Sequence, residues 1–246
     1  MTWLERCNSK TFLTIVWLLY VAHIRAAQPV LVELFTSEGC SSCPPADALL
    51  QKLERNPTTP DTVVIAMSEH VDYWNHLGWN DPFSTAQMSV RQQAYALRFG
   101  SKGPYTPQMV VDGVDEFVGS DASRARHAIA DAATRPKVEL TLQSAGPGKL
   151  HISAPAGKAA DLFVAIVYDP DPSAVSRGEN SGRRLIHISV VKSLKKVGEL
   201  GRNRPFDADV PFAADSRLPN ERLVVFAQER GQGRVLGAAS VSASAP

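Results

Sequence analysis

Cys40-Ser-Ser-Cys43 is the sequence feature that most constrains the fold of this chain. The motif follows an apolar run, residues 30–35, and precedes a run whose apolar residues recur at helical spacing from Ala46 onward. Two cysteines three positions apart on the first turn of a helix place both sulfurs on one side, within bonding range. A thiol pair between a strand and a helix is typical of redox exchange. The pattern therefore predicts an α/β unit with its chemistry at that junction.

Residues 1–27 have the features of a secretory signal peptide. Arg6 and Lys10 provide a basic start, and residues 12–24 form an apolar stretch too short to span a bilayer comfortably. We therefore expect export to the periplasm or beyond, with no membrane span after cleavage; an uncleaved anchor is the alternative. In such an oxidising compartment, the cysteine pair persists as a disulfide.

Composition narrows the range of partners. The chain has 26 basic and 25 acidic residues, a balance that argues against nucleic acid as the main partner. Its 246 residues are enough for two modest domains. The sequence contains no glycine-rich phosphate loop, nucleophile elbow or zinc-hydrolase motif. We therefore expect no cofactor and no resident metal ion.

Residues 28–136 alternate between strand-like and helix-like patterns. Ser84-Thr-Ala-Gln87 fits a capping box, and the helix that starts there should present Val90, Ala94 and Leu97 on one side before it ends at Gly100. Asp112-Gly113 between apolar runs predicts a hairpin. The predicted strands are residues 30–35, 62–67, 107–112 and 114–118, and the predicted helices begin near residues 44, 84 and 121.

This order of elements resembles the thioredoxin superfamily. Three motifs look more narrowly like the bacterial family called domain of unknown function 1223. They are FTSEGCSSCPPAD (35–47), HVDYWNHLGWNDPF (70–83) and YTPQ (105–108). The resemblance implies a thioredoxin-like domain over residues 28–136, with Cys40 as the exposed nucleophile and Cys43 as the buried resolving thiol. The narrower family implies location and fold better than it implies activity.

The resemblance also implies two neighbours of the cysteine pair. Thr106-Pro107 stands where such folds carry a cis proline that faces the cysteines, so Thr106 and Pro107 would bind a substrate chain; an ordinary trans proline is the alternative. Glu33 lies near the position of a buried acid and would act as a base toward Cys43. The alternative for Glu33 is an exposed residue at a sheet edge.

His70 follows the second predicted strand, at the sheet end that also carries the cysteine pair. Its imidazole could move protons during exchange. Trp74 and Trp79 could form an apolar docking surface, and Tyr73 and Trp74 are candidate substrate-binding residues. Two alternatives stay open. The aromatic residues could close the core under a long loop, or His70, Asp72 and His76 could join the cysteines around a metal, although their spacing matches no tight metal signature.

Two adjacent prolines follow the cysteine pair, and residues before proline disfavour the helical region. We therefore expect the helix after Cys43 to begin late. Residues 137–246 contain several short apolar or alternating runs, which predict a β-rich domain resembling an antiparallel sandwich. The family resemblance extends there through residues 178–182 and 187–192. The predicted strands are residues 137–143, 150–153, 162–168, 185–191, 206–210 and 223–227.

The leading functional hypothesis is an exported thiol–disulfide oxidoreductase that uses Cys40 and Cys43 on protein or small-molecule thiols and disulfides. The first alternative is a periplasmic protein that handles copper through the two thiolates. The second is a non-enzymatic binding module in which the cysteines form a structural disulfide. A bond that closes so small a loop gives little stability, which disfavours a purely structural role.

Overall fold

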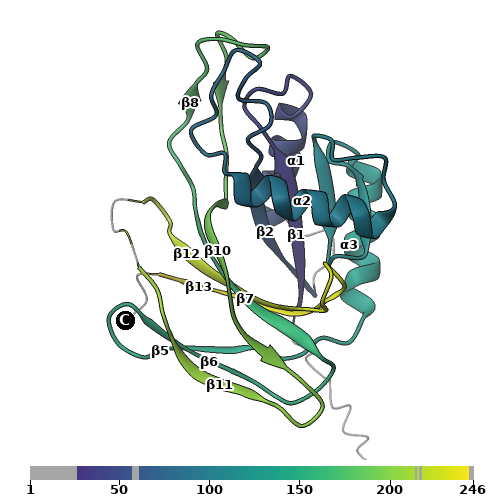
Figure 1. Ribbon diagram of the computed structural model, residues 1–246, viewed down its shortest axis with the longest axis vertical. Helices are drawn as coiled ribbons and strands as arrows, with labels where there is room; N and C mark the ends of the chain where they lie inside the picture. Colours follow the sequence, from purple (N-terminus) through teal and green to yellow (C-terminus); the bar gives the residue numbers. More distant parts are fainter. Residues whose placement is uncertain (1–26, 57–60, 214, 216–217, 244–246) are drawn as a thin grey trace, which may run out of the picture.

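A mixed sheet of eight strands runs through the molecule (Figure 1), in the order β13-β12-β7-β10-β2-β1-β3-β4. The computed structural model describes residues 27–56, 61–213, 215 and 218–243. Within these residues there are three helices: α1 (Pro44–Arg55), α2 (Ala86–Phe99) and α3 (Ala122–Thr134). The strands of the large sheet are β1 (Gln28–Thr36), β2 (Thr62–His70), β3 (Gln108–Val111), β4 (Asp115–Val118), β7 (Ala160–Tyr168), β10 (Val190–Leu200), β12 (Arg222–Gln228) and β13 (Val235–Ser242).

Two smaller sheets complete the fold. A three-stranded sheet has the order β11-β6-β5, and a ribbon of two strands pairs β8 with β9. Most neighbouring strands are antiparallel; among the strands of the described part of the chain, the parallel pairs are β1 with β2 and β2 with β10. The smaller strands are β5 (Thr141–Ser144), β6 (Lys149–Ala154), β8 (Ser173–Ala174), β9 (Arg184–Leu185) and β11 (Phe206–Pro211).

The side chains of strand β1 point alternately to two faces of the sheet, and different helices pack on each face. Because successive side chains of a strand point to opposite faces, Val32 and Leu34 pack with α1 and α3, whereas Leu31 and Phe35 pack with α2. Figure 1 shows α2 crossing the near face of β1 and β2. The helix that follows the cysteine motif and helix α2 therefore lie on opposite faces of the sheet.

Helix α1 begins at Pro44, immediately after the second cysteine. Cys43 is its N-cap and already has helical backbone angles (φ −77°, ψ −38°), so the expected late start is wrong. The prolines occupy first-turn positions, where a backbone N–H would have no helical partner. Ala46, Leu50 and Leu53 form the buried stripe of the helix, as their spacing indicates.

Helix α2 starts one residue later than the capping box predicts. The N-cap is Thr85, whose hydroxyl accepts a hydrogen bond from Met88 N. Gln87 does not close a capping box, because its side chain donates to the backbone carbonyl of Leu194. Gly100 ends the helix with a φ of 67°, a left-handed conformation that favours glycine.

The buried face of α2 is not the predicted one. Val90 and Leu97 are 70% and 75% exposed. The helix instead buries Arg91, Gln92 and Tyr95, whose polar groups have partners inside the protein. A polar buried face conceals the amphipathic signal, because the apolar residues then stand on the outside.

The second half of the chain extends the first half's sheet. Val190 of β10 pairs with Ser68 of β2, and Ser68 N donates to Ser189 O at 2.8 Å. Strands β7, β12 and β13 then follow β10 outward. The protein is therefore a mixed α/β fold whose large sheet crosses the expected boundary at residue 136.

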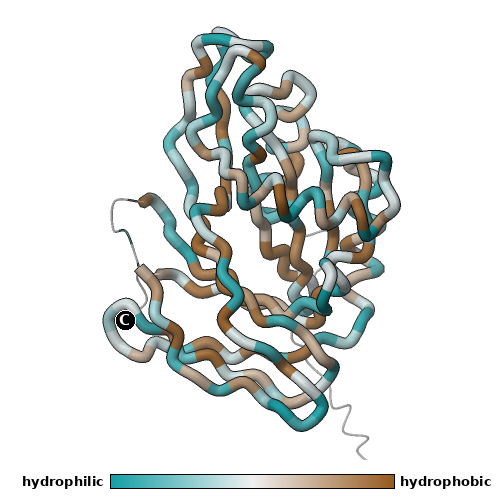
Figure 2. The backbone as a smooth tube through the Cα atoms, viewed as in Figure 1, coloured by the Kyte–Doolittle hydropathy of each residue, from teal (hydrophilic) through white to brown (hydrophobic). Residues whose placement is uncertain are grey.

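The three-stranded sheet covers the outer part of the large sheet. Leu150 and Ile152 of β6 share a core with Leu162 of β7 and Leu223 of β12, on the face opposite to α2. Figure 2 shows the hydrophobic residues gathered along these strands. This sandwich-like packing agrees in part with the expected β-rich region.

Two strand predictions fail in this region. The predicted strand over residues 185–191 is divided: Leu185 ends β9, residues 186–189 lie between the strands, and β10 begins at residue 190. Strand β13 was not predicted, since its small residues give little apolar signal. An added Cβ at Gly237 would lie 2.1 Å from Val138 O, so close packing there requires glycine.

The predicted Asp112-Gly113 hairpin is confirmed, with positive φ angles of 48° and 65°. The carboxylate of Asp112 accepts a hydrogen bond from Leu31 N at 3.0 Å and pairs with Lys137. Its carbonyl accepts from Val235 N at 2.8 Å. This turn therefore joins β1 to β13, two strands that lie far apart in the order of the sheet.

The expected signal peptide lies outside the described residues except for its last position. Among the described residues, no helix combines the length and hydropathy needed to cross a bilayer.

Candidate functional site

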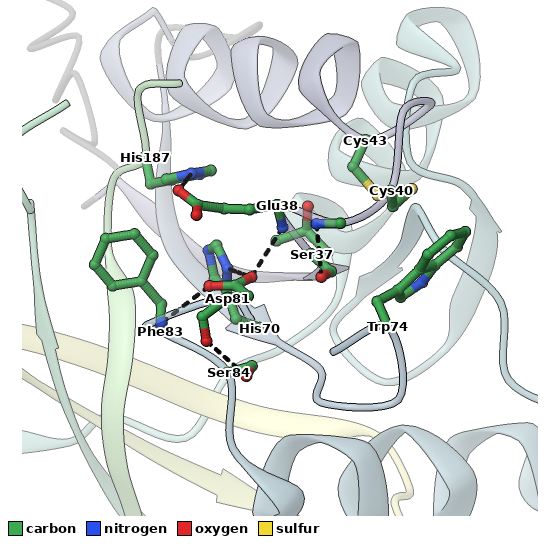
Figure 3. A network of polar contacts seen from close by, with 12 residues as sticks. Ser37, Glu38, Cys40, Cys43, His70, Trp74, Asp81, Phe83, Ser84 and His187 are labelled. Carbon is green, nitrogen blue, oxygen red and sulfur yellow. Dashed lines mark hydrogen bonds and ion pairs between the residues drawn. A yellow bond between two sulfur atoms is a disulfide. The ribbon is translucent and has the colours of Figure 1, made fainter. Parts of the chain in front are cut away.

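Cys40 and Cys43 form a disulfide between the end of β1 and the start of α1 (Figure 3), with their Cα atoms 5.4 Å apart. Both residues are 0% exposed. The exposed Cys40 that the family resemblance implied is therefore wrong for this state. Ser42 Oγ lies 3.3 Å from Cys40 Sγ and is the one hydroxyl of the motif within hydrogen-bond range of a sulfur.

Thr106, Pro107 and Trp74 gather beside the cysteine motif. The Thr106–Pro107 bond is cis, as the resemblance implied. A Cβ added at Gly119 would lie 3.1 Å from Pro107 Cβ and 3.2 Å from Ala46 Cβ, so Pro107 lies near the first turn of α1. Trp74 Nε1 donates to Thr106 Oγ1 at 2.9 Å, and Trp74 also packs against Gly39.

The side chain of Tyr73 also hydrogen-bonds with Thr106 of this group. The Tyr73 hydroxyl donates to Gln92 Oε1 of α2 at 3.0 Å. Burial is the main cause that raises the pKa of Tyr73, to about 12. Tyr73 therefore stays protonated near neutral pH and joins the loop to α2.

A buried cluster of acids and imidazoles lies beside the disulfide, and we call it the histidine network. Asp81 is its centre: Oδ2 contacts His70 Nδ1 at 2.7 Å and accepts from Glu38 N at 2.9 Å. Asp81 Oδ1 accepts from the backbone N–H of Phe83 at 2.9 Å. The members of the network are Glu38, Asp47, His70, Asp81 and His187.

His187 connects the second half of the chain to the network. Its Nε2 lies 3.3 Å from Glu38 Oε1, and its Nδ1 lies 3.9 Å from Asp47 Oδ2. The rings of His187 and His70 meet edge to face at 4.7 Å. Asp47 is one helical turn beyond Cys43, and its Oδ1 accepts from Thr36 Oγ1 at 2.9 Å. The network thus extends from the residue two before Cys40 to the residue four after Cys43.

Burial and pairing shift the pKa values of the network in opposite directions. Burial lowers the pKa of His70, but Asp81, with smaller contributions from Asp47 and Glu38, outweighs burial and the net shift is upward. Burial raises the pKa of Asp81, yet His70 and two backbone donors bring it down to about 2. Burial is also the main cause that raises the pKa of Asp47. His70 and Asp81 therefore favour the charged pair, whereas Asp47 favours its neutral form.

Glu38 is held as a carboxylate by its neighbours. Burial alone would raise its pKa, but hydrogen bonds from His187, Ser173 and Trp79 reverse the effect and lower it. Trp79 Nε1 donates to Glu38 Oε2 at 2.8 Å. His70 Nε2 and His187 Nδ1 have no hydrogen-bond partner among the described residues. Two imidazole nitrogens thus remain for proton transfer within the network.

Glu33 lies on the other face of the sheet. Its carboxylate accepts from Arg91 Nε at 2.6 Å and from Tyr95 Oη at 2.6 Å, both on α2. It is 0% exposed, so the alternative of an exposed edge residue is wrong. Because β1 alternates its side chains, Glu33 points away from the face that carries α1 and Cys43.

We call the cluster around Glu33 the arginine network. Arg91 also lies 3.5 Å from Glu69 Oε1, and burial followed by the Glu33 charge raises the pKa of Glu69 well above its usual value. Gln228 Nε2 donates to Tyr95 Oη at 2.8 Å, which brings β12 into the cluster. Its members are Glu33, Glu69, Arg91, Tyr95 and Gln228.

A connection from the second half of the chain lies over the cysteine motif. We call residues 173–187 the cover segment; it includes β8 and β9. Asn180, 0% exposed, donates from Nδ2 to Glu38 O and to Cys40 O, both at 2.9 Å. Glu179 Oε2 accepts from Ser41 N at 3.0 Å. The segment therefore holds the backbone on both sides of the first cysteine.

The described residues contain no cluster of three or more His, Cys, Asp or Glu side chains arranged to hold a metal ion. His76, proposed above as a possible ligand, is exposed, and Asp72 accepts from Ser89 Oγ. The cysteines, being joined, offer no free thiolate in this state.

The sequence predicts that His70, Trp74 and Thr106-Pro107 lie near the cysteine pair, and the structure places them there. Five residues that the structure adds were missed, although each stands inside a segment that carries the family resemblance. The missed residues are Glu38, Asp47, Asp81, Asn180 and His187.

Comparisons with solved structures agree with this fold. A crystal structure of an Agrobacterium tumefaciens protein, a structural genomics target, is 28% identical, with a TM-score of 0.71, over 89% of this chain and 96% of that one. HBP35 of Porphyromonas gingivalis is 17% identical, with a TM-score of 0.57, over 88% of this chain and 76% of that one, which shows a similar fold alone. No curated protein matches the chain.

A family model described as "Protein of unknown function (DUF1223)" matches residues 31–228, which include the disulfide, both polar networks and the cover segment. The chain therefore belongs to the DUF1223 family.

Proposed function

We propose that this protein is a thioredoxin-like thiol–disulfide oxidoreductase whose reactive group is the Cys40–Cys43 disulfide. The observation that carries the proposal is the place of that disulfide, at the N-terminus of α1 with Pro107 beside the same helical turn. The strand order β2-β1-β3-β4, with α1 and α3 on one face and α2 on the other, supports the thioredoxin-like assignment.

The reaction follows from the pair of sulfurs. A thiolate of a partner attacks Cys40 Sγ, the Cys40–Cys43 bond breaks, and Cys43 leaves as a thiolate. A second thiolate of the partner then attacks the partner's own sulfur in the mixed disulfide, so Cys40 leaves as a thiolate, the partner gains a disulfide and the cysteine pair is left as a dithiol. Run in reverse from the dithiol, the same steps reduce a partner's disulfide.

Asp47 and the imidazoles supply nearby proton sites for these steps. The raised pKa of Asp47 means that this buried acid can hold a proton one helical turn from Cys43. His187 lies between Asp47 and Glu38, so a proton has a path through the histidine network. Glu33, which belongs to the arginine network, has no part in the proposed reaction.

The reduction potential of the disulfide tests the proposal. The purified protein is equilibrated in glutathione buffers, free thiols are trapped by alkylation, and the modified species are counted by mass. A potential between roughly −120 and −270 mV is the range of working oxidoreductases and would support exchange. A potential below about −300 mV marks a structural disulfide and would overturn the proposal.

One observation favours a second candidate, a binding module with a structural disulfide. Both cysteines are 0% exposed, so no thiol reaches them without movement of the surrounding chain. The same potential measurement separates the candidates. A Cys43→Ala variant provides the companion test, because only an exchanging protein traps partners through Cys40 as mixed disulfides.

We also propose that the protein acts outside the cytoplasm, in the periplasm or beyond. The basic start and short apolar stretch of residues 1–27 support this location. Cell fractionation, with the mass of the mature N-terminus, tests it. Full-length protein recovered with cytoplasmic markers would contradict it.

A further inference from the structure

We propose that the cover segment, residues 173–187, closes the disulfide against incoming thiols, and that Asn180 is the positioning residue that holds it closed. The inference rests on the proposed function, because it concerns access to the same two sulfurs. It assigns to the second half of the chain the task of deciding when a thiol can reach Cys40.

The contacts of Asn180 are directed at the backbone of the cysteine motif. One amide group bonds Glu38 O and Cys40 O, the two carbonyls that flank Gly39. Glu179 bonds Ser41 N on the following residue. The cover segment therefore occupies backbone polar groups beside Cys40. An extended substrate chain would otherwise bind these groups.

Side-chain packing seats the segment over the same place. A Cβ added at Gly178 would lie 3.1 Å from Trp79 Cβ, so the tip of the segment contacts the loop that leads from β2 to α2. His187 bonds Glu38 at the other end. Figure 3 shows Glu38 and His187 on one side of the disulfide and Trp74 on the other. The motif is thus enclosed by the cover segment and by the β2–α2 loop.

The cover segment has the features of a part that opens locally. Its ribbon has two residue pairs, Ser173 with Leu185 and Ala174 with Arg184, and it forms a sheet of its own. Most of its residues are exposed; the buried ones are Val175, Asn180, Leu185 and His187. Segments with few buried contacts open at a lower free energy than the core. Opening the segment need not disturb β7 or β10, which pair with each other at its base.

Opening precedes the chemical step. Once the segment is displaced, a thiolate attacks Cys40 Sγ, the bond to Cys43 breaks, and the electron pair stays on Cys43 as a thiolate that takes up a proton. If opening and closing are faster than attack, the observed rate is proportional to the open fraction. Loss of the two Asn180 hydrogen bonds should then raise the rate in proportion to that fraction.

The experiment measures the rate of disulfide reduction by dithiothreitol in the full-length mature protein and in Asn180→Ala. The variant should react at least roughly tenfold faster, as expected from losing two buried hydrogen bonds. The matched control is Gln228→Ala, which removes a buried amide from the arginine network on the other face of the sheet. Free energies of unfolding are measured for all three proteins.

Equal rates in the wild type and Asn180→Ala would overturn the inference. So would equal acceleration in Asn180→Ala and Gln228→Ala, because general destabilisation would then explain both. Should Asn180→Ala not fold, Glu179→Arg replaces it: the residue is exposed, and the change reverses the charge facing Ser41 N. That variant should also react faster, and an unchanged rate would again overturn the inference.

The reduction potential, measured on the same samples, separates this inference from the proposed function. A potential below about −300 mV with a faster Asn180→Ala variant would sink the oxidoreductase and leave the closure intact. A potential between roughly −120 and −270 mV with equal reduction rates in the wild type and Asn180→Ala would support the oxidoreductase and overturn the closure.

Discussion

Two buried polar networks lie on opposite faces of strands β1 and β2. They differ in the type of cationic side chain that pairs with their carboxylates. The arginine network sets Glu33 and Glu69 against Arg91, whose pKa is raised further by Glu33 even though burial opposes this. The histidine network sets its acids against His70 and His187. A guanidinium keeps its charge at every physiological pH, whereas an imidazole gains and loses its proton near neutrality.

The difference separates a structural network from a candidate chemical one. The arginine network joins α2 to β1, β2 and β12, and among the described residues no hydrogen bond or ion pair links it to the cysteines. The histidine network borders the disulfide and contains two imidazole nitrogens that have no hydrogen-bond partner among the described residues. A buried acid in the first strand is therefore a poor guide to function, and the groups that surround the acid are a better one.

Replacement of Arg91 by methionine should have the largest effect on stability. Arg91→Met leaves Glu33 and Glu69 buried without their cation, which costs about 3–5 kcal/mol in the free energy of unfolding. Urea denaturation measures the loss. The reduction potential of the disulfide should stay as in the wild type, and a large change in potential would break the distinction between the networks.

Replacement of Asp81 by asparagine should cost less, about 2 kcal/mol, because one charged hydrogen-bonded pair is lost. The raised pKa of His70 stabilises the fold fully below its ordinary value of 6.5 and ceases to do so as the pH rises through the raised value. Wild-type stability should therefore fall from about pH 6.5 upward. In Asp81→Asn that fall should disappear; urea titrations at several pH values would show whether it persists.

The free energy of unfolding at acidic pH provides a second test of the Asp81 assignment. Its lowered pKa contributes stability above the ordinary value of 3.8, and that contribution is lost as the pH falls toward about 2. Wild-type protein should lose this stability in acid and Asp81→Asn should not. Equal losses in the two proteins would contradict the assigned pair.

Reduction of the disulfide should lower the free energy of unfolding by about 2 kcal/mol, because the cysteines are only three positions apart. The measurement compares oxidised and reduced protein in urea at one pH. A loss well above about 4 kcal/mol would show that the bond serves mainly as a structural crosslink.

Replacement of Asp47 by asparagine should have the smallest effect and the opposite sign. Burial raises the pKa of Asp47, so the wild type loses stability as the pH rises from 3.8 through the raised value. Asp47→Asn removes that loss and should be more stable by on the order of 1 kcal/mol above it. A less stable variant at neutral pH would show that the charged form of Asp47 is needed by His187.

Local patterns foretold much of the first half of the fold. The alternating elements, the Asp112-Gly113 hairpin and the cysteine motif at a strand-to-helix junction all depend on neighbouring residues, which a single sequence displays. The apolar residues of α2 indicate the wrong buried face, because Arg91 has a buried partner, Gln228, on a strand distant in the chain.

The candidate site was foretold less completely, for the same physical reason. The position of Glu33 along β1 did not reveal which face it occupies until the strand's register was known. Asn180 bonds the carbonyl of Cys40 from 140 residues away in the chain, and no local pattern carries such a contact. Only the family resemblance over residues 178–182 and 187–192 pointed to that segment.

The place of the cover segment late in the chain has a consequence for protein synthesis. A ribosome completes β1, α1 and the cysteine motif long before it adds residues 173–187, and chains fold from the N-terminus as they emerge. During that interval the two thiols have no cover and meet whatever oxidant or reductant surrounds the nascent chain. Until residues 173–187 are added, the proposed cover is missing, and alkylation of chains arrested before and after residue 187 would show when the thiols become protected.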